Sequence, residues 1–194
     1  MTVLVLATAN PDKASEMEAL FENLGIAIRP RPSGLDDVEE TSETLEGNAL
    51  LKARAVAAAS GELAVADDTG LFVDALDGRP GVRSARYAGA GATYADNVLK
   101  LLGELHDVDE SERTARFRTV LCVATPTGDW WSVEGVLEGV ITRVIRGTGG
   151  FGYDPIFAPH ELGGRTLAEV GVEEKNAISH RGRALRALAE KLQG

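Results

Sequence analysis

The chain has 194 residues, of which 44% are hydrophobic and 26% are charged, and its formal net charge is −10. This length suffices for one core, and no window of the sequence approaches the roughly 18 apolar residues that a membrane span needs. We therefore expect a single globular domain over residues 1–194 and no membrane partner. The negative charge argues against nucleic acid as a partner. No basic leader precedes the first apolar run, which predicts a cytoplasmic protein.

Strand and helix signals alternate along the chain, with one long hairpin near its middle. Asn10 and Pro11 suit the start of a first helix, and Thr93 with Asp96 predicts a capping box for a later one. This alternation indicates an α/β fold with a mixed sheet flanked by helices. The predicted strands cover residues 2–7, 26–29, 63–66, 115–125, 130–142 and 156–157, and residues 71–76 resume apolar character after the acid pair. The predicted helices begin near Asn10, Thr44, Thr93 and Ser179.

The turn after the first strand is a candidate phosphate site. Thr8, Asn10 and Lys13 bring a hydroxyl, an amide and an ammonium to a helix N-terminus, where backbone N–H groups and the helix dipole favour an anion. The Gly-Lys-Ser/Thr ending of a P-loop is missing. The alternative is that Thr8 and Asn10 only cap the helix while Lys13 is solvated.

The sequence has two acidic pairs, and the first of them could serve a divalent metal. Asp67 and Asp68 follow a buried strand, and successive strand residues point to opposite faces, so their carboxylates should have different roles. One could hold Mg²⁺ while the other orients or deprotonates water. Glu39 and Glu40 form the second pair, and Asn48 and Lys52 lie four apart on one face of the Ala-rich helix, where they could point together into a cleft. The alternative is an Asp-Asp-Thr-Gly turn with solvated acids.

The stretch 147–152 reads Gly-Thr-Gly-Gly-Phe-Gly and matches the literal dinucleotide pattern. Pro155 follows too closely for a helix to begin there, which weighs against an NAD-linked oxidoreductase. A loop of bare backbone with Phe151 and Tyr153 as stacking faces and Asp154 as an acceptor predicts a nucleobase pocket. The alternative is an ordinary Gly-rich hairpin.

The last predicted helix places positive charge in its first turn. His180 and Arg181 follow Ser179 there, and this opposes the helix dipole. A bound anion or carbonyl would relieve the conflict, which indicates a functional site. The alternative is a basic surface turn paired with Glu173 and Glu174.

Taken together, these motifs resemble the inosine triphosphate pyrophosphatase family, also called Ham1-like. The resemblance covers essentially the whole chain in the order of the family's motifs, and two small departures are Ala9 for glycine and Thr69 for serine. The motifs are Thr-Ala-Asn-Pro-Asp-Lys at Thr8, Asn48 with Lys52, Ala-Asp-Asp-Thr-Gly at Ala66, the glycine-rich stretch at Gly147 and Ser-His-Arg-Gly at Ser179.

The resemblance implies an elongated α/β homodimer with two lobes and a cleft between them, which hydrolyses ITP, dITP and XTP to the monophosphate and pyrophosphate with Mg²⁺. It implies that Glu40 and Asp68 bind the metal, and that Asp68 accepts the proton with support from Asp67. The substrate-binding residues that it implies are Thr8, Asn10, Lys13 and Lys52 for the triphosphate, Thr69, Phe151 for stacking on the base, and Gly152, Tyr153, Asp154, Lys175, His180 and Arg181 for its edge and ribose. A non-catalytic purine-nucleotide sensor is the main alternative, but it gives the acidic pairs no purpose.

Overall fold

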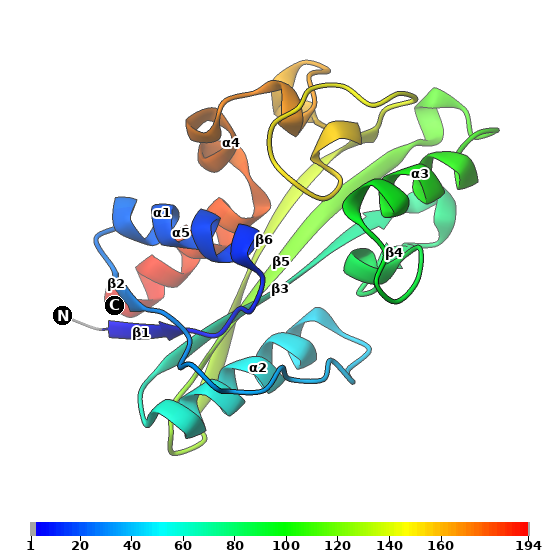
Figure 1. The fold of residues 1–194 in the computed structure, drawn as a ribbon. Helices are drawn as coiled ribbons and strands as arrows, with labels where there is room; N and C mark the ends of the chain where they lie inside the picture. Colours follow the sequence, from blue (N-terminus) through cyan, green and yellow to red (C-terminus); the bar gives the residue numbers. More distant parts are fainter. Residues whose placement is uncertain (1–2, 194) are drawn as a thin grey trace. The chain divides into compact units, whose positions relative to one another are not determined.

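The computed structural model describes residues 3–193, and Figure 1 shows them as a ribbon. These residues form seven strands and five α-helices, joined by loops and short 3-10 turns. The strands are β1 (Val3–Leu6), β2 (Ala27–Arg29), β3 (Ala64–Val73), β4 (Pro80–Gly81), β5 (Thr114–Ala124), β6 (Trp130–Ile141) and β7 (Phe157–Pro159). The helices are α1 (Pro11–Asn23), α2 (Leu45–Ser60), α3 (Tyr94–Glu104), α4 (Val172–Ile178) and α5 (His180–Gln193).

The strands pair in the order β2-β1-β3-β5-β6-β7, with β4 beside β3. Strand β1 runs parallel to β2 and β3, whereas β4 is antiparallel to β3 and β7 is antiparallel to β6. The sheet is therefore mixed, and helices flank it (Figure 1). This confirms the predicted α/β class. Within residues 3–193, no helix is both long and apolar enough to cross a bilayer.

The chain divides into two compact units. Unit 1 consists of the residues up to Asp68, residues 119–135 and the residues from Arg181 onward, and unit 2 consists of residues 69–118 and 136–180. Strands β3, β5 and β6 each contribute residues to both units.

Unit 1 has helices on both faces of its strands (Figure 1). Leu4, Leu6 and Val65 belong to a core with side chains of α1 and α5, including Phe21 and Leu185. Because side chains alternate along a strand, the intervening buried residues point to the other face, which α2 covers with its small residues. The small side chains of α2 let this helix approach the sheet closely.

Unit 2 has its own core between α3 and the strands β3, β5, β6 and β7. Phe117 and Phe157 meet edge to face there, with ring centroids 4.7 Å apart. Arg113 is 2% exposed, and its guanidinium donates to the carbonyl oxygens of Leu105, Ile141 and Thr142. This side chain therefore ties the end of α3 to the end of β6.

Most local signals in the sequence have the predicted effect. The Asn10 side chain accepts hydrogen bonds from the first turn of α1, and Thr44 caps α2 in the same way. Thr93 and Asp96 form the predicted capping box at the start of α3. Strands β5 and β6 follow the predicted hairpin within one residue at each end.

Four elements differ from the prediction, and the first is the short strand β4, which lies in a segment expected to be a turn. Strand β3 does not end before the acid pair but continues to Val73, because both carboxylates have cationic partners and do not need the solvent of a turn. Helix α4 was not predicted, since its seven residues are too few to show a periodic apolar face. The strand expected at 156–157 begins one residue later, after a 3-10 turn at Asp154–Ile156. Thr2, in the first predicted strand, lies outside the described residues.

Candidate active site

The turn between β1 and α1 and the first turn of α1 carry three of the predicted site residues, Thr8, Asn10 and Lys13. The Asn10 side-chain oxygen accepts from the backbone N–H groups of Asp12 and Lys13, and the Asn10 N–H donates to Thr8 Oγ1. Lys13 is not solvated: its Nζ lies 3.1 Å from Asp67 Oδ2, and its side chain is 18% exposed. The turn therefore fixes an ammonium beside a helix N-terminus, which favours anion binding.

Asp67 lies on the face of β3 that α1 and α5 cover. Its carboxylate is buried and contacts Lys13 and, at 3.4 Å, Arg181 Nη2. Arg181 also pairs with Glu16 of α1. Burial alone would raise the pKa of Asp67, but the positive charges of Lys13, Arg181 and Lys52 outweigh it and hold this pKa well below its usual range. Asp67 is therefore an ionised anchor for two cations.

Asp68 points to the opposite face of β3, toward α2. Its Oδ1 lies 3.2 Å from Lys52 Nζ, and its Oδ2 accepts from Asn48 Nδ2 at 3.4 Å. Burial raises the pKa of Asp68, and the nearby charges of Glu40 and Asp67 act in the same direction, while Lys52 and Lys13 only partly oppose them. The neighbouring acids thus have opposite pKa shifts, and Asp68 is the better proton acceptor of the two.

Lys52 joins the second acidic pair to the first. Its Nζ donates to Glu40 Oε1 at 2.9 Å as well as to Asp68. Burial would lower the pKa of Lys52, but the charges of Asp68, Asp67 and Glu40 raise it above its ordinary value. Lys52 therefore stays protonated and holds two carboxylates of distant segments together.

Glu40 comes from residues 30–44, which form no helix or strand. Arg31 fixes the first part of this loop by donating to Asp37 Oδ1 at 2.8 Å and to the carbonyl oxygens of Leu35 and Asp36. Asn48 fixes the second part, because its Oδ1 accepts from the Ser42 N–H. Sequence reasoning missed Arg31, since its acceptors are mostly backbone carbonyls that no residue type reveals.

A second group of predicted residues gathers around Phe151 in unit 2. Asp154 is buried, and its Oδ2 accepts both from the Phe151 N–H at 2.9 Å and from Lys175 Nζ at 2.7 Å. The Lys175 ammonium lies 4.8 Å from the centroid of the Phe151 ring, within cation–π range. The Asp154 carboxylate therefore holds in place both the backbone of the loop at Phe151 and the Lys175 ammonium above the Phe151 ring.

Two glycines of the loop are required by the protein's own packing rather than by an approaching ligand. A Cβ on Gly147 would lie 2.3 Å from the backbone of Ala168, and a Cβ on Gly150 would lie 2.0 Å from Asp154 Oδ2. Both residues also have a positive φ. The loop leads directly into a 3-10 turn at Asp154–Ile156 and then into β7 rather than into an α-helix, so the literal dinucleotide pattern has no structural counterpart here.

The other predicted site residues belong to several different elements of the fold. The His180 ring stacks on Phe117, with centroids 4.5 Å apart, and the Tyr153 hydroxyl donates to the Ser84 carbonyl oxygen. Thr69 is partly buried, and Gly152 is a loop residue. Arg181 belongs to unit 1 with Asp67, whereas the Phe151 group belongs to unit 2. The alternative that Glu174 pairs with this basic turn is wrong, because Glu174 pairs with Arg165.

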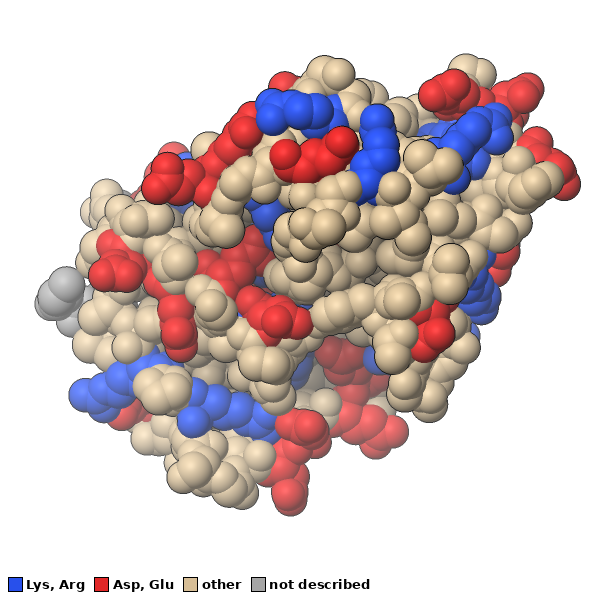
Figure 2. Space-filling view, turned by 45° about the horizontal axis from the view of Figure 1, so that its top comes forward, with Lys and Arg blue, Asp and Glu red and all other residues tan. Residues whose placement is uncertain are grey.

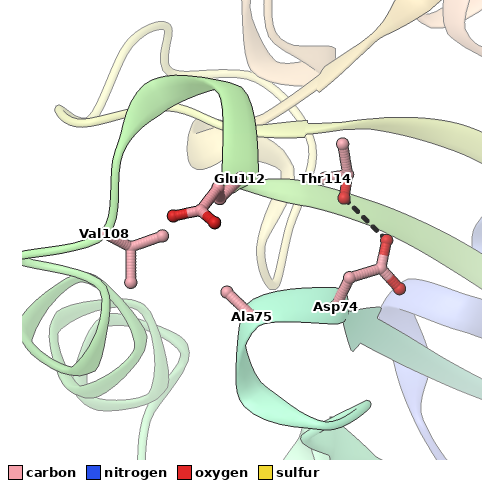
Figure 3. Close-up of a pocket in the computed structure, with 5 residues that line it drawn as sticks. All are labelled: Asp74, Ala75, Val108, Glu112 and Thr114. Carbon is pink, nitrogen blue, oxygen red and sulfur yellow. Dashed lines mark hydrogen bonds between the residues drawn. The ribbon is translucent and has the colours of Figure 1, made fainter.

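The surface charge agrees with the composition. Figure 2 shows Asp and Glu spread over this face of the protein, with Lys and Arg between them rather than in one continuous basic patch. Unit 2 also has an open pocket lined by Asp74, Ala75, Val108, Glu112 and Thr114 (Figure 3). In this pocket the Thr114 hydroxyl donates to Asp74 at 2.7 Å. None of the predicted site residues lines it.

A mixed α/β sheet that presents paired acids, lysines and a helix N-terminus within unit 1 has the features of a phosphate-binding α/β protein. The model of the Ham1 family matches residues 4–191, and the chain belongs to this family.

Curated relatives and solved structures agree with this assignment. The dITP/XTP pyrophosphatases of Chlorobaculum tepidum and Geobacter sulfurreducens are 49% and 48% identical to this chain, over 97% and 99% of its length and 92% and 97% of theirs. The structure of a HAM1 protein from Coxiella burnetii superposes with a TM-score of 0.89 at 43% identity, and covers 100% of this chain and 99% of that one. A nucleoside-triphosphatase / dITP/XTP pyrophosphatase from Mycobacterium abscessus gives 0.76 at 43% identity, with 97% of both chains covered. The family predicted from the motifs is confirmed.

Proposed function

We propose that this protein hydrolyses the non-canonical purine nucleoside triphosphates ITP, dITP and XTP to the monophosphate and pyrophosphate, and so removes them from the nucleotide pool. The observation that carries the proposal is the meeting of three separated motifs in unit 1, where Lys13 pairs with Asp67 and Lys52 pairs with the adjacent Asp68. The names of the relatives, dITP/XTP pyrophosphatase, supply the substrate class.

The triphosphate is bound by unit 1 in this proposal. Lys13 and Lys52 are cations held in place by Asp67 and Asp68, and Thr8 and Asn10 belong to the N-terminal turn of α1. Lysine ammonium groups and helix N-terminal N–H groups are the donors that phosphate oxygens prefer. These residues orient the phosphate chain and stabilise the negative charge of the departing pyrophosphate.

The acids of unit 1 suit Mg²⁺. Glu40 and Asp68 offer hard carboxylate oxygens and are brought together through Lys52. Within residues 3–193, no group of three or more Asp, Glu, His or Cys side chains could hold a metal by itself. Mg²⁺ is typically bound by one or two carboxylates plus substrate phosphates and water, so the two acids fit. When bound, the ion would neutralise phosphate charge and acidify water.

Asp68 is the proton acceptor in this proposal, and Asp67 is its support. The raised pKa of Asp68 brings its basicity closer to that needed for accepting a proton from water. Asp67 stays ionised and keeps Lys13 and Arg181 in position. In this proposal Asp68 therefore accepts the proton, and Asp67 positions the cations.

The purine is bound by unit 2 in this proposal, through stacking on Phe151. Lys175 supplies a donor for the carbonyl at position 6 of hypoxanthine or xanthine, and Asp154 holds this donor. Adenine has an amino group at position 6, which would face the donor without an acceptor, and such a mismatch is costly. The further contacts to the base and the ribose that we propose are Thr69, Gly152, Tyr153, His180 and Arg181.

The proposal is tested by incubating the full chain with ITP, dITP, XTP, ATP or GTP and measuring pyrophosphate and orthophosphate separately, with Mg²⁺ and with EDTA. We expect pyrophosphate from the first three nucleotides and only with Mg²⁺. Release of orthophosphate, or equal use of ATP, contradicts the proposal. Nucleotide binding without turnover would identify a sensor instead. We further propose a homodimer acting in the cytoplasm, and light scattering of the purified protein tests the dimer.

A further inference from the structure

Tyr94 contacts the Phe151 group, although no motif in the sequence singles it out. The centroids of the Tyr94 and Phe151 rings are 5.9 Å apart, and the ring planes are tilted by 40°. This separation lies within the 4.5–7 Å range of interacting aromatic pairs. The two rings are tilted against each other rather than stacked face to face.

Tyr94 is the first residue of α3, and its position on the helix indicates which way its side chain faces. Asn97, Val98 and Leu101 are the buried residues of the helix, and Tyr94 precedes Asn97 by three positions and Val98 by four. It therefore lies on the inward face of α3. Even so, Tyr94 is 41% exposed. An inward-facing aromatic side chain that stays exposed beside Phe151 is placed for a ligand rather than for the core.

The other neighbours of Phe151 indicate which chemical groups a ligand at this position must carry. Lys175 lies over the Phe151 ring and is held there by Asp154. The group thus combines two aromatic rings with a donor cation fixed by a carboxylate. A flat, apolar ring with a carbonyl at its edge satisfies both features, because stacking uses the rings and the carbonyl accepts from the ammonium.

We propose that Tyr94 is a substrate-binding residue that forms the second aromatic contact to the purine, beside Phe151. This inference rests on the proposed function. Tyr94 acts on nucleoside affinity and not on the phosphates, which are bound by residues of unit 1 in that proposal. The aromatic ring matters, and the hydroxyl does not, because stacking requires only the π-face.

The test compares Tyr94→Ala, Tyr94→Phe and the matched control Leu99→Ala, which removes another exposed apolar side chain from the same helix. We expect Tyr94→Ala to raise the KM for dITP and the inhibition constant of inosine monophosphate about fivefold or more, the lower end of base–aromatic stacking. The kcat and the inhibition constant of inorganic pyrophosphate should not change. Tyr94→Phe and Leu99→Ala should match the wild type.

Unchanged values for dITP and inosine monophosphate in Tyr94→Ala would overturn the inference. An equal rise in the inhibition constant of pyrophosphate would also overturn it, because a merely structural role would weaken both halves of the substrate. Failure of the proposed function is seen separately, as absence of pyrophosphate release from dITP, ITP and XTP by the wild-type protein.

Discussion

Asp67 and Asp68 are adjacent in β3 and point to opposite faces of the sheet, Asp67 toward Lys13 and Arg181 and Asp68 toward Lys52. The alternation of a strand thus separates two like charges that would otherwise repel each other at close range. Burial raises both pKa values, but the cations around Asp67 outweigh it and those around Asp68 do not, so the two pKa values move in opposite directions.

Asp68→Asn should abolish turnover while leaving nucleotide binding largely intact. The amide keeps the shape of the side chain but cannot accept a proton, and loss of a general base lowers rates by about 10²- to 10⁴-fold. The kcat for dITP and the dissociation constant of the nucleotide measure the two effects. Asp74→Asn, which changes an acid outside the proposed site, is the control. Near-normal rates in Asp68→Asn would show that the base is misplaced.

Asp67→Asn should destabilise the fold by about 3–5 kcal/mol at pH 7, the range found when one partner of a buried ion pair is removed. Because the pKa of Asp67 is lowered in the folded protein, its contribution is complete above the unfolded value of 3.8 and is lost as the pH falls through the folded value. The difference from wild type in urea unfolding should therefore be the same at pH 7 and pH 5 and smaller at pH 3. Glu62→Gln breaks only the exposed pair with Arg29 and should cost less than about 1 kcal/mol. Equal effects of the two variants would refute the buried anchor.

Gly150→Ala should weaken both the fold and purine binding. The new methyl group would meet Asp154 Oδ2, which holds Lys175 and the Phe151 backbone, and it would sit at a φ of 67°. Gly163→Ala is the matched control, because its φ is 58° and nothing lies within 4 Å of the added atom. The control should show only backbone strain of about 1–2 kcal/mol. Thermal unfolding and the KM for dITP separate the two variants, and identical behaviour would contradict the role of Asp154.

Cys122 should resist alkylation in the native protein. Burial, together with the charge of Glu46, raises the pKa of its thiol to about 12, so about one thiol in ten thousand is ionised at pH 8. Reaction with a thiol-specific reagent should be slow in buffer and rapid in urea, with one thiol per chain in urea. Equal rates in the two solvents would show that the thiol is exposed in the folded state.

The elements of the fold could be predicted wherever a local signal sets them. Asn10, Thr44 and the Thr93–Asp96 pair start their helices as expected, because a cap acts within three residues. The continuation of β3 past Asp68 could not be predicted in this way. Its two acids are stabilised by Lys13, Arg181 and Lys52, which are distant in sequence, and turn propensity carries no information on such partners.

The candidate site was predictable by residue type but not by arrangement. Glu40 and Lys52 were expected near Asp68, and the sequence did not indicate that Lys52 would join the two acids. Arg31 and Tyr94 were missed, because each acts through a contact that depends on the course of a loop or the end of a helix. Such contacts exist only after the chain has folded.

Asn48 joins the loop of Glu40 to β3, because its side-chain oxygen binds the backbone of Ser42 and its nitrogen reaches Asp68. Asn48 is fully buried in α2, so a single amide side chain fixes both the loop that carries Glu40 and the carboxylate of Asp68 against the same helix. The spacing between the two acids is therefore determined by a neutral side chain as well as by the ammonium of Lys52.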